Sequence, residues 1–254
     1  MKKKCLTLSE PETEAMLAFG NNIKSIKHMI AILSHEAIVF KSQASRFATK
    51  EISLTTKQDR EKLAQRLNRL VKTTHNFTER ITNLQFWTVV MMVTCVEAYL
   101  QDVLTAAASV DPNLMCKSEQ SALYADIIAA SSLESLANEL RRRWAQNWLN
   151  DGGPTRWISR LTKMGVRGYP SNLAPQLERF WGIRHIVVHS AGVATTDFVR
   201  RHPNMVKAAG DRLPAKYCDL SLFLKTMMEF LKPTESFFLA RYPSLGANPE
   251  VPKK

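Results

Sequence analysis

The sequence predicts an all-α protein. Apolar residues recur at steps of three and four along most of the chain, and alternating runs typical of β-strands are scarce. Only 9 Gly and 11 Pro occur in 254 residues, which disfavours turn-rich β architectures and glycine-rich nucleotide-binding folds. With 45% hydrophobic and 23% charged residues, the composition is that of a globular protein. We therefore expect a helical bundle.

Two long helices are predicted in the first half of the chain. Helical spacing of apolar residues runs over 12–47, and a second periodic segment begins near Lys57. This second helix either continues to Ala108 or breaks near Thr73. From this pattern we expect residues 1–75 to form an N-terminal helical region packed on the core.

The most apolar stretch, FWTVVMMVTCVEAYL at 86–100, predicts a buried core helix. It has only 15 residues and contains Glu97, whereas a membrane span requires about 20 apolar residues. The stretch therefore predicts no membrane span. A membrane surface is also not an expected partner, because no predicted helix pairs a strongly basic face with an exposed aromatic one.

The remaining segments complete a predicted helical domain at 76–243, followed by a tail at 244–254 that we expect to be disordered. Turn signals such as DPN at 111–113 and GGP at 152–154 separate the helical segments. In order, these segments are a helical region at 114–149, a short helix around WISRLTK, a helix from 173 to about 189, a basic loop at 193–214 and a helix at 215–241.

Charge and cysteine usage point to a partner class and a compartment. The 35 Lys and Arg against 23 Asp and Glu give a formal net charge of +12, which favours a polyanion such as RNA or DNA, or an anionic membrane surface. The four cysteines are scattered and form no CxxC pair, so neither a zinc site nor a disulfide framework is indicated. The basic start turns acidic before any apolar signal-peptide core. We expect a cytoplasmic protein without metal or cofactor.

The segment at 173–190 departs from a simple amphipathic helix. Steps of three and four from Leu173 lead to Arg184, which places a charge where the helix should face inward. A buried guanidinium needs an anionic partner, for which Glu97, Glu178 and a bound phosphate are the candidates. His189 lies five residues beyond Arg184, about 140° around a regular helix. The two converge on one ligand only if the helix ends or bends there, or if a second subunit closes the site.

An arginine and a histidine without metal ligands suit RNA cleavage. An imidazole can take the proton of a ribose 2′-OH or donate one to the leaving 5′-oxygen, while arginine stabilises the charge on the phosphate. His185 is a candidate for the complementary acid or base. The same spacing also arises by chance, so structural or surface roles for both histidines stay open.

Arg184-His185-Ile-Val-Val-His189 resembles the R-x4–6-H signature of HEPN (higher eukaryotes and prokaryotes nucleotide-binding) domains. The segment 96–104, with Glu97 and Tyr99, is similar to the E-x-Y-L helix of the same superfamily, particularly its RiboL-PSP-like branches. The resemblance covers about residues 80–240. It implies a helical bundle that dimerises to form a composite, metal-independent RNase site, often as a toxin in toxin–antitoxin or antiviral defence systems. By position, Arg184 would bind phosphate, His189 would be the catalytic imidazole and His185 an auxiliary residue.

Further cationic residues are candidates for RNA contacts. Arg141, Arg142 and Arg143 lie beside tryptophans, and Arg200 and Arg201 lie in the basic loop. A solvated helix face is the simpler explanation for the triplet. An antitoxin or other regulatory partner is compatible with the enzyme hypothesis. The alternative is a noncatalytic helical module that binds RNA or protein.

Overall fold

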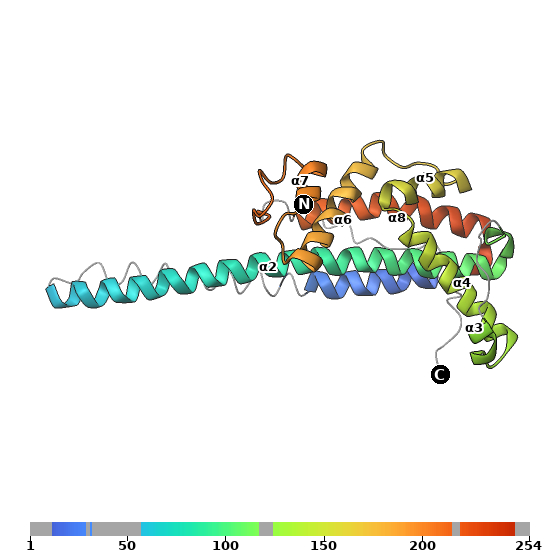
Figure 1. Ribbon diagram of the computed structural model, residues 1–254, viewed down its shortest axis with the longest axis horizontal. Coiled ribbons are helices and arrows are strands. Elements are labelled where there is room, and N and C mark those ends of the chain that lie inside the picture. Colours follow the sequence, from blue (N-terminus) through green and yellow to red (C-terminus); the bar gives the residue numbers. More distant parts are fainter. Residues whose placement is uncertain (1–11, 29–30, 32–56, 117–123, 215–218, 247–254) are drawn as a thin grey trace, which may run out of the picture. The chain divides into compact units, whose positions relative to one another are not determined.

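The protein consists of helices joined by loops (Figure 1). The computed structural model describes residues 12–28, 31, 57–116, 124–214 and 219–246. Within these ranges there is no β-strand, and the β-bridges are two isolated ones, Thr13–Gly246 and Val193–Arg212. The all-α prediction is confirmed.

The helices have well-defined bounds. They are a helix at residues 14–28, α2 (Lys57–Val110), the 3-10 helix η1 (Pro112–Leu114), α3 (Tyr124–Ala129), α4 (Leu133–Asn150), α5 (Pro154–Met164), α6 (Leu173–Ser190), α7 (Thr196–Arg201), α8 (Leu220–Arg241) and the 3-10 helix η3 (Pro243–Leu245).

The chain folds into two compact units, and both α2 and α6 contribute residues to each. The first unit comprises the described residues within Met1–Asn22, Val93–Gly182 and Ser221–Lys254, and the second those within Ile23–Met92 and Ile183–Leu220. The expected boundary at residue 75 lies inside α2, which continues without interruption from Lys57 to Val110. Of the two alternatives for this helix, continuation is the one observed.

The apolar stretch at 86–100 forms part of the core, as predicted. Val89, Met92, Val93, Val96 and Leu100 follow one another at steps of one, three and four, and each is fully buried. The segment Ile81–Val110 is long and apolar enough to cross a membrane, by length and composition alone, but half of its most apolar window is buried inside the protein. This burial is what a core helix requires.

The first unit has a core of aromatic and aliphatic residues from the helix at 14–28, α2, α5, α6 and α8. Phe180 and Phe223 meet edge to face with ring centroids 4.3 Å apart, which joins α6 to α8. The buried side chains of this unit include Phe19, Val96, Tyr99, Leu100, Leu104, Trp157, Leu161, Leu177, Phe180, Phe223, Phe230 and Phe238.

A buried carboxylate, Glu235 of α8, holds the start of the N-terminal helix against this core. It accepts hydrogen bonds from the Thr13 backbone N–H (2.6 Å), the Thr13 hydroxyl (3.0 Å) and the Tyr99 hydroxyl (2.8 Å). Thr13 also accepts a hydrogen bond from the Met16 N–H, so it caps the helix at residues 14–28. Burial and the neighbouring Glu235 raise the pKa of Tyr99 well above its ordinary value, which keeps the hydroxyl protonated as a donor.

The second unit is built around the part of α2 up to Met92, the second half of α6 and the segment at 193–214. The end of the helix at 14–28 adds Ile23 and Ile26 to its core. The other buried apolar residues are Phe86, Val89, Val90, Met92, Ile183, Ile186, Val187, Ala194, Phe198, Met205, Val206 and Leu213.

The structure differs from the sequence predictions at two places. The helical region predicted at 114–149 is interrupted, because Ser132 adopts an extended backbone and its hydroxyl accepts the Ser135 N–H (3.1 Å), which starts α4 anew. Residues 117–123 lie outside the described residues. Residues 244–246, expected to begin a disordered tail, are instead ordered, since η3 is followed by Gly246, which pairs with Thr13. The rest of the expected tail, 247–254, lies outside the described residues.

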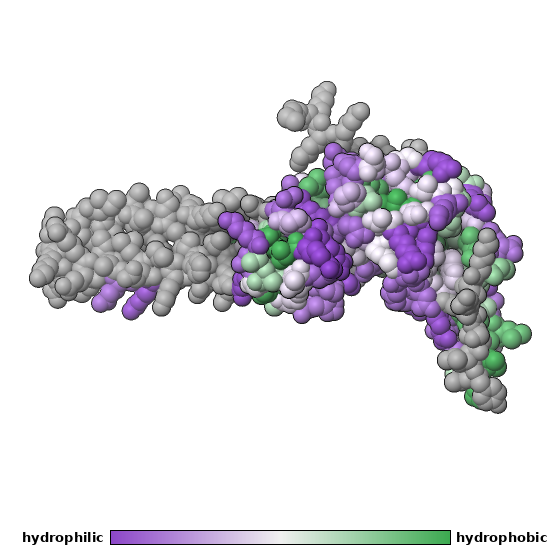
Figure 2. All heavy atoms as spheres, turned by 45° about the horizontal axis from the view of Figure 1, so that its top comes forward, coloured by the Kyte–Doolittle hydropathy of each residue, from purple (hydrophilic) through white to green (hydrophobic). Residues whose placement is uncertain are grey.

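Around this interruption the surface is unusually apolar. Ile127, Ile128 and Leu133 are 53%, 67% and 86% exposed. Hydrophobic side chains are visible around α3 in Figure 2. Between Ile127 and Leu133 the apolar periodicity that predicted a helix therefore does not correspond to a buried face, whereas farther along α4 it leads to buried Trp144.

The hydrogen bonds of Glu235 predict a difference in stability between two Tyr→Phe variants. Tyr99→Phe removes a donor from a buried carboxylate and should cost about 1–3 kcal/mol. Tyr169→Phe removes a bond of 2.7 Å to the neutral Thr234 hydroxyl and should cost less, about 0.5–1.5 kcal/mol. Thermal unfolding of both variants measures the difference. A Tyr169→Phe effect equal to or larger than that of Tyr99→Phe would contradict this account of Glu235.

Candidate functional site on helix α6

The buried side of helix α6 consists of apolar residues and does not include Arg184. Leu173, Leu177 and Phe180 are buried, as predicted, but the next fully buried position is Ile183. Arg184 is half-buried at the edge of this path, with its Nε atom buried. The sequence step that ended on Arg184 is thus off by one residue, because a helix offers both i+3 and i+4 positions to the same face.

The two histidines of α6 lie together on its exposed side. His185 and His189 are both exposed, and their ring centroids are 4.7 Å apart with an interplanar angle of 47°. Residues four apart in a helix are neighbours on its surface, so regular helical geometry accounts for this pairing. The structure therefore presents two adjacent imidazoles to solvent.

Arg184 and His189 do not share a face of α6. The helix continues to Ser190, so it neither ends nor breaks between the two residues. At 100° per residue they are about 140° apart around the axis. On a regular helix, the two therefore meet at one ligand only if a second subunit closes the site.

The end of α6 is fixed directly after His189. Gly192 has a φ of 78°, a conformation that glycine adopts at low cost, and its N–H donates to the Ile186 carbonyl at 2.9 Å. The Leu213 N–H donates to the Gly192 carbonyl at 3.0 Å, which closes the base of the basic segment at 193–214. This segment was expected to be a long loop, but it contains α7, capped by Thr195 and anchored by buried Phe198.

The two glutamates proposed as partners of Arg184 have contacts elsewhere. Glu97 accepts the indole N–H of Trp181 at 3.0 Å, and Glu178 accepts the Thr155 backbone N–H at 2.9 Å. Both belong to the first unit, whereas Arg184 belongs to the second. Their pairing with Arg184 stays a prediction.

The predicted RNA-binding arginines of α4 are largely engaged within the protein. Arg141 donates to Glu134 (3.2 Å) and Asn138 (2.7 Å). Arg143 makes two hydrogen bonds to Asp126, at 2.7 and 3.0 Å. Arg142 is the exposed member of the triplet. Arg142 and Arg143, but not Arg141, line part of an open hollow of about 720 Å³ between α3 and α4, whose walls carry both acidic and basic residues.

Arg200 and Arg201 are also held by an acid. Both guanidinium groups form ion pairs with Asp197 in the first turn of α7. One carboxylate thus offsets half of the positive charge of Arg200 and Arg201. The contribution of these two arginines to RNA binding stays a prediction.

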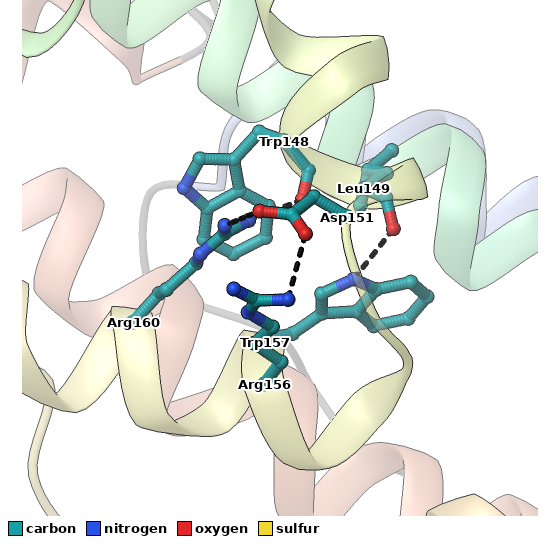
Figure 3. Close-up of polar contacts among 6 residues, drawn as sticks. All are labelled: Trp148, Leu149, Asp151, Arg156, Trp157 and Arg160. Carbon is teal, nitrogen blue, oxygen red and sulfur yellow. Dashed lines mark hydrogen bonds and ion pairs between the residues drawn. The ribbon is translucent and has the colours of Figure 1, made fainter. Parts of the chain in front are cut away.

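A cationic cluster that the sequence reading missed lies where α4 passes into α5 (Figure 3). Asp151 pairs with both Arg156 (2.7 Å) and Arg160, and Arg160 also donates to the Trp148 carbonyl at 2.7 Å. The Arg160 guanidinium lies 5.4 Å from the centroid of the Trp148 ring. The sequence did contain a signal for this cluster, namely the helical spacing of Arg156, Arg160 and Lys163. The short helix predicted around WISRLTK left Arg156 outside it, so the three cations were not considered together.

Within the part of the chain that the structure describes, no group of three or more His, Cys, Asp and Glu residues is arranged to hold a metal ion. No protein-family model, curated protein or solved structure matches the chain. The HEPN resemblance therefore rests on the residues of α6 and α2 themselves.

The ion pairs of Asp197 predict a pH-dependent contribution to stability. Hydrogen bonds from Arg201 and then Arg200 lower the pKa of Asp197 in the folded protein. The stabilisation is therefore present above the unfolded-state pKa of about 3.9, and is lost as pH falls through the lower folded-state value. Asp197→Asn should lower the unfolding temperature at pH 7, and the difference from the unmutated protein should shrink progressively below about pH 4.

Thermal unfolding across pH 3–7 measures this difference. As a control, Asp197→Asn should have little further effect in an Arg200→Ala/Arg201→Ala background. A difference that persists unchanged at low pH would show that Asp197 acts by another route.

Proposed function

We propose that the protein is a metal-independent endoribonuclease of HEPN type, acting in the cytoplasm as a toxin or antiviral defence effector. The observation that carries this proposal is the exposed pair of imidazoles, His185 and His189, on the same helix as Arg184. Two adjacent imidazoles supply both a proton acceptor and a proton donor at neutral pH, which is what RNA transphosphorylation needs.

The proposed reaction begins with attack of a ribose 2′-oxygen on the adjacent phosphorus. One imidazole takes the 2′-OH proton as the O2′–P bond forms, and the other, protonated, gives a proton to the 5′-oxygen as the P–O5′ bond breaks. The products are a 2′,3′-cyclic phosphate and a free 5′-OH. His189 is the proposed catalytic imidazole, His185 its complementary acid or base, and Arg184 the group that binds the phosphate and stabilises its developing charge.

A second copy of the chain completes the proposed site. Because Arg184 and His189 lie about 140° apart on α6, one phosphate can contact both only if two copies face each other. Apolar residues exposed in the second unit support such an association: Trp87 and Met91 are 53% and 46% exposed, and Val188, beside His189, is 42% exposed. Exposed apolar groups of this kind are typical of surfaces that bind another protein.

The charge of the second unit also supports an RNA substrate. The ordered segment at 193–214 joins the end of α6 and carries four Lys and Arg residues against two Asp residues. Together with the net charge of +12, this excess favours attraction of a polyanion. DNA lacks the 2′-OH, so the proposed chemistry selects RNA.

Substitution of the α6 residues tests the activity. His189→Ala and Arg184→Ala should each reduce RNA cleavage by at least 100-fold, a typical size for loss of general acid–base catalysis or of charge stabilisation. Cleavage by the unmutated protein should persist in EDTA, yield 2′,3′-cyclic phosphate ends and show a bell-shaped pH profile. The pH profile of His185→Ala should no longer fall on one of its two sides, because one of the two titrating groups is absent. Electrophoresis of labelled RNA with end-group analysis measures these effects.

The matched control is His28→Ala, since His28 is an exposed helical histidine of the same unit. It should cleave RNA as the unmutated protein does, and both it and the unmutated protein should arrest growth on expression, whereas His189→Ala should not. Full cleavage by purified His189→Ala and Arg184→Ala would refute the proposal. RNA binding without any cleavage by the unmutated protein would favour the noncatalytic module instead.

Mixing of inactive subunits tests the composite site. If Arg184 of one copy acts with His189 of the other, a heterodimer of Arg184→Ala and His189→Ala subunits contains one intact site. After exchange of subunits, roughly a quarter of the unmutated activity should return, because half of the dimers are mixed and each has one of two sites. Cleavage by equimolar mixtures, with dimer formation followed by light scattering, measures this recovery. A mixture that stays inactive although mixed dimers form would show that each copy holds its own site.

A further inference from the structure

Helix α5 has a buried apolar side and an outward cationic side. Pro154, Trp157 and Leu161 are buried, and the Trp157 indole N–H donates to the Leu149 carbonyl at 2.9 Å. The burial of these residues fixes the rotation of the helix about its axis. The opposite side carries the cations at steps of four and three, Arg156, Arg160 and Lys163.

A fourth cation extends this row beyond the end of the helix. Arg167 is exposed and follows α5, and its guanidinium donates to the Thr162 carbonyl at 3.1 Å, in the last turn. A cation at the carboxyl end of a helix is favoured by the partial negative charge there. We refer to Arg156, Arg160, Lys163 and Arg167 as the α5 basic face.

Two of the four cations are held in place by neighbouring groups. Asp151 lies between Arg156 and Arg160, and the guanidinium of Arg160 lies against the Trp148 ring (Figure 3). A guanidinium ordered in this way loses less conformational entropy when it binds a further anion. Arg156 keeps donors beyond the one that Asp151 occupies.

The loop before α5 is shaped so that Arg156 can reach Asp151. Gly152 has a φ of 90°, and a Cβ atom at this position would lie 2.5 Å from Cδ of Arg156. Only glycine therefore permits both this backbone conformation and the close approach of the arginine side chain. The contact of Arg156 with Asp151 depends on a backbone feature specific to this loop.

The α5 basic face has more uncompensated charge than the other arginine clusters. Among the described residues, no carboxylate forms an ion pair with Lys163 or Arg167. Asp151 is the acid within the face, so four cations are balanced by one carboxylate. In contrast, Arg200 and Arg201 share one acid between two cations.

We propose that the α5 basic face binds the phosphate backbone of RNA. The choice of RNA as the polyanion rests on the proposed function, and the face adds to it a binding surface outside the residues of α6. Between Arg156 and Lys163 the helix rises by about 10 Å, so the cations form an extended row and not a single point of charge. The hydroxyls of exposed Ser159 and Thr162 add donors to phosphate oxygens.

An anionic membrane fits this face less well than RNA. Helices that lie on membranes insert an exposed apolar side between lipid headgroups, beside their basic residues. The apolar side of α5 is instead buried in the first unit, with Trp157 3% and Leu161 0% exposed. The outward residues offer charge and hydroxyl groups, which suit a phosphate backbone.

The double variant Lys163→Ala/Arg167→Ala tests this assignment, because these two cations have no carboxylate partner among the described residues. It is made in the His189→Ala background, where labelled RNA stays intact during binding. Loss of two phosphate contacts should lower the slope of log affinity against log salt by about 1.4, and the affinity at 0.1 M salt by roughly 10–30-fold. In the unmutated background, the RNA concentration needed for half-maximal cleavage should rise accordingly.

The matched control is Lys225→Ala/Lys232→Ala, also in His189→Ala. Both lysines are exposed on α8 in the same unit, and their loss changes the net charge by the same amount. The control should keep nearly the full affinity and salt slope. Fluorescence anisotropy with a 20-nucleotide RNA measures binding, and sedimentation with phosphatidylserine vesicles measures any binding to lipid.

The outcomes separate the two proposals. RNA binding that is weakened only in the α5 variant supports RNA binding by the α5 basic face. This holds even if the unmutated protein proves unable to cleave RNA and the ribonuclease proposal fails. Unchanged RNA binding by the α5 variant overturns the proposed role of the α5 basic face, whether or not cleavage depends on His189. An equal loss in the α8 control, or α5-dependent binding to vesicles without binding to RNA, also overturns it.

Discussion

The burial of one side of α2 is the constraint on which both units depend. Val89 and Met92 lie in the core of the second unit, and Val96, Leu100 and Leu104 in that of the first. Burial of each large apolar side chain contributes about 1.5–3 kcal/mol, so this one helix supplies a large share of the hydrophobic stabilisation of both cores. The hydrogen bonds to Glu235 then attach the N-terminal helix and α8 to the same part of α2, through Tyr99.

Burial along α6 determines which of its polar residues can take part in chemistry. Ile183, Ile186 and Val187 are buried, and this leaves His185 and His189 on the exposed side. Exposed imidazoles can exchange protons with a substrate, whereas imidazoles packed in a core could not. The same rotation sets Arg184 at the edge of the buried side, so that Arg184 and His189 of one chain face different directions. The proposed requirement for two copies follows from this geometry.

The sequence was sufficient to predict the features that depend on periodicity. The all-α class, the buried run at 86–100, the short helix α5 and the extent of α6 all follow from apolar spacing and from Gly and Pro signals. It was not sufficient where particular side-chain contacts decide the outcome. The pairing of Arg143 with Asp126 and the capping of α4 by Ser132 depend on local geometry that spacing alone does not encode. The arginine triplet at 141–143 was predicted as a candidate because its members are consecutive in the sequence. The cations of the α5 basic face are three or four residues apart and meet only on the folded helix, so they were not predicted as a group.

Net charge attracts a polyanion, but the local balance of charge decides where it binds. A guanidinium already paired with a carboxylate gains little from a phosphate, because the new interaction must replace an existing one. Arg143 and Arg201 are in this position, each bonded to an aspartate. Lys163 and Arg167 are not, since no carboxylate among the described residues forms an ion pair with them. For this reason the α5 basic face, with two of its four cations lacking a carboxylate partner among the described residues, is a stronger candidate for RNA binding than a run of arginines in the sequence, although each cation adds equally to the net charge.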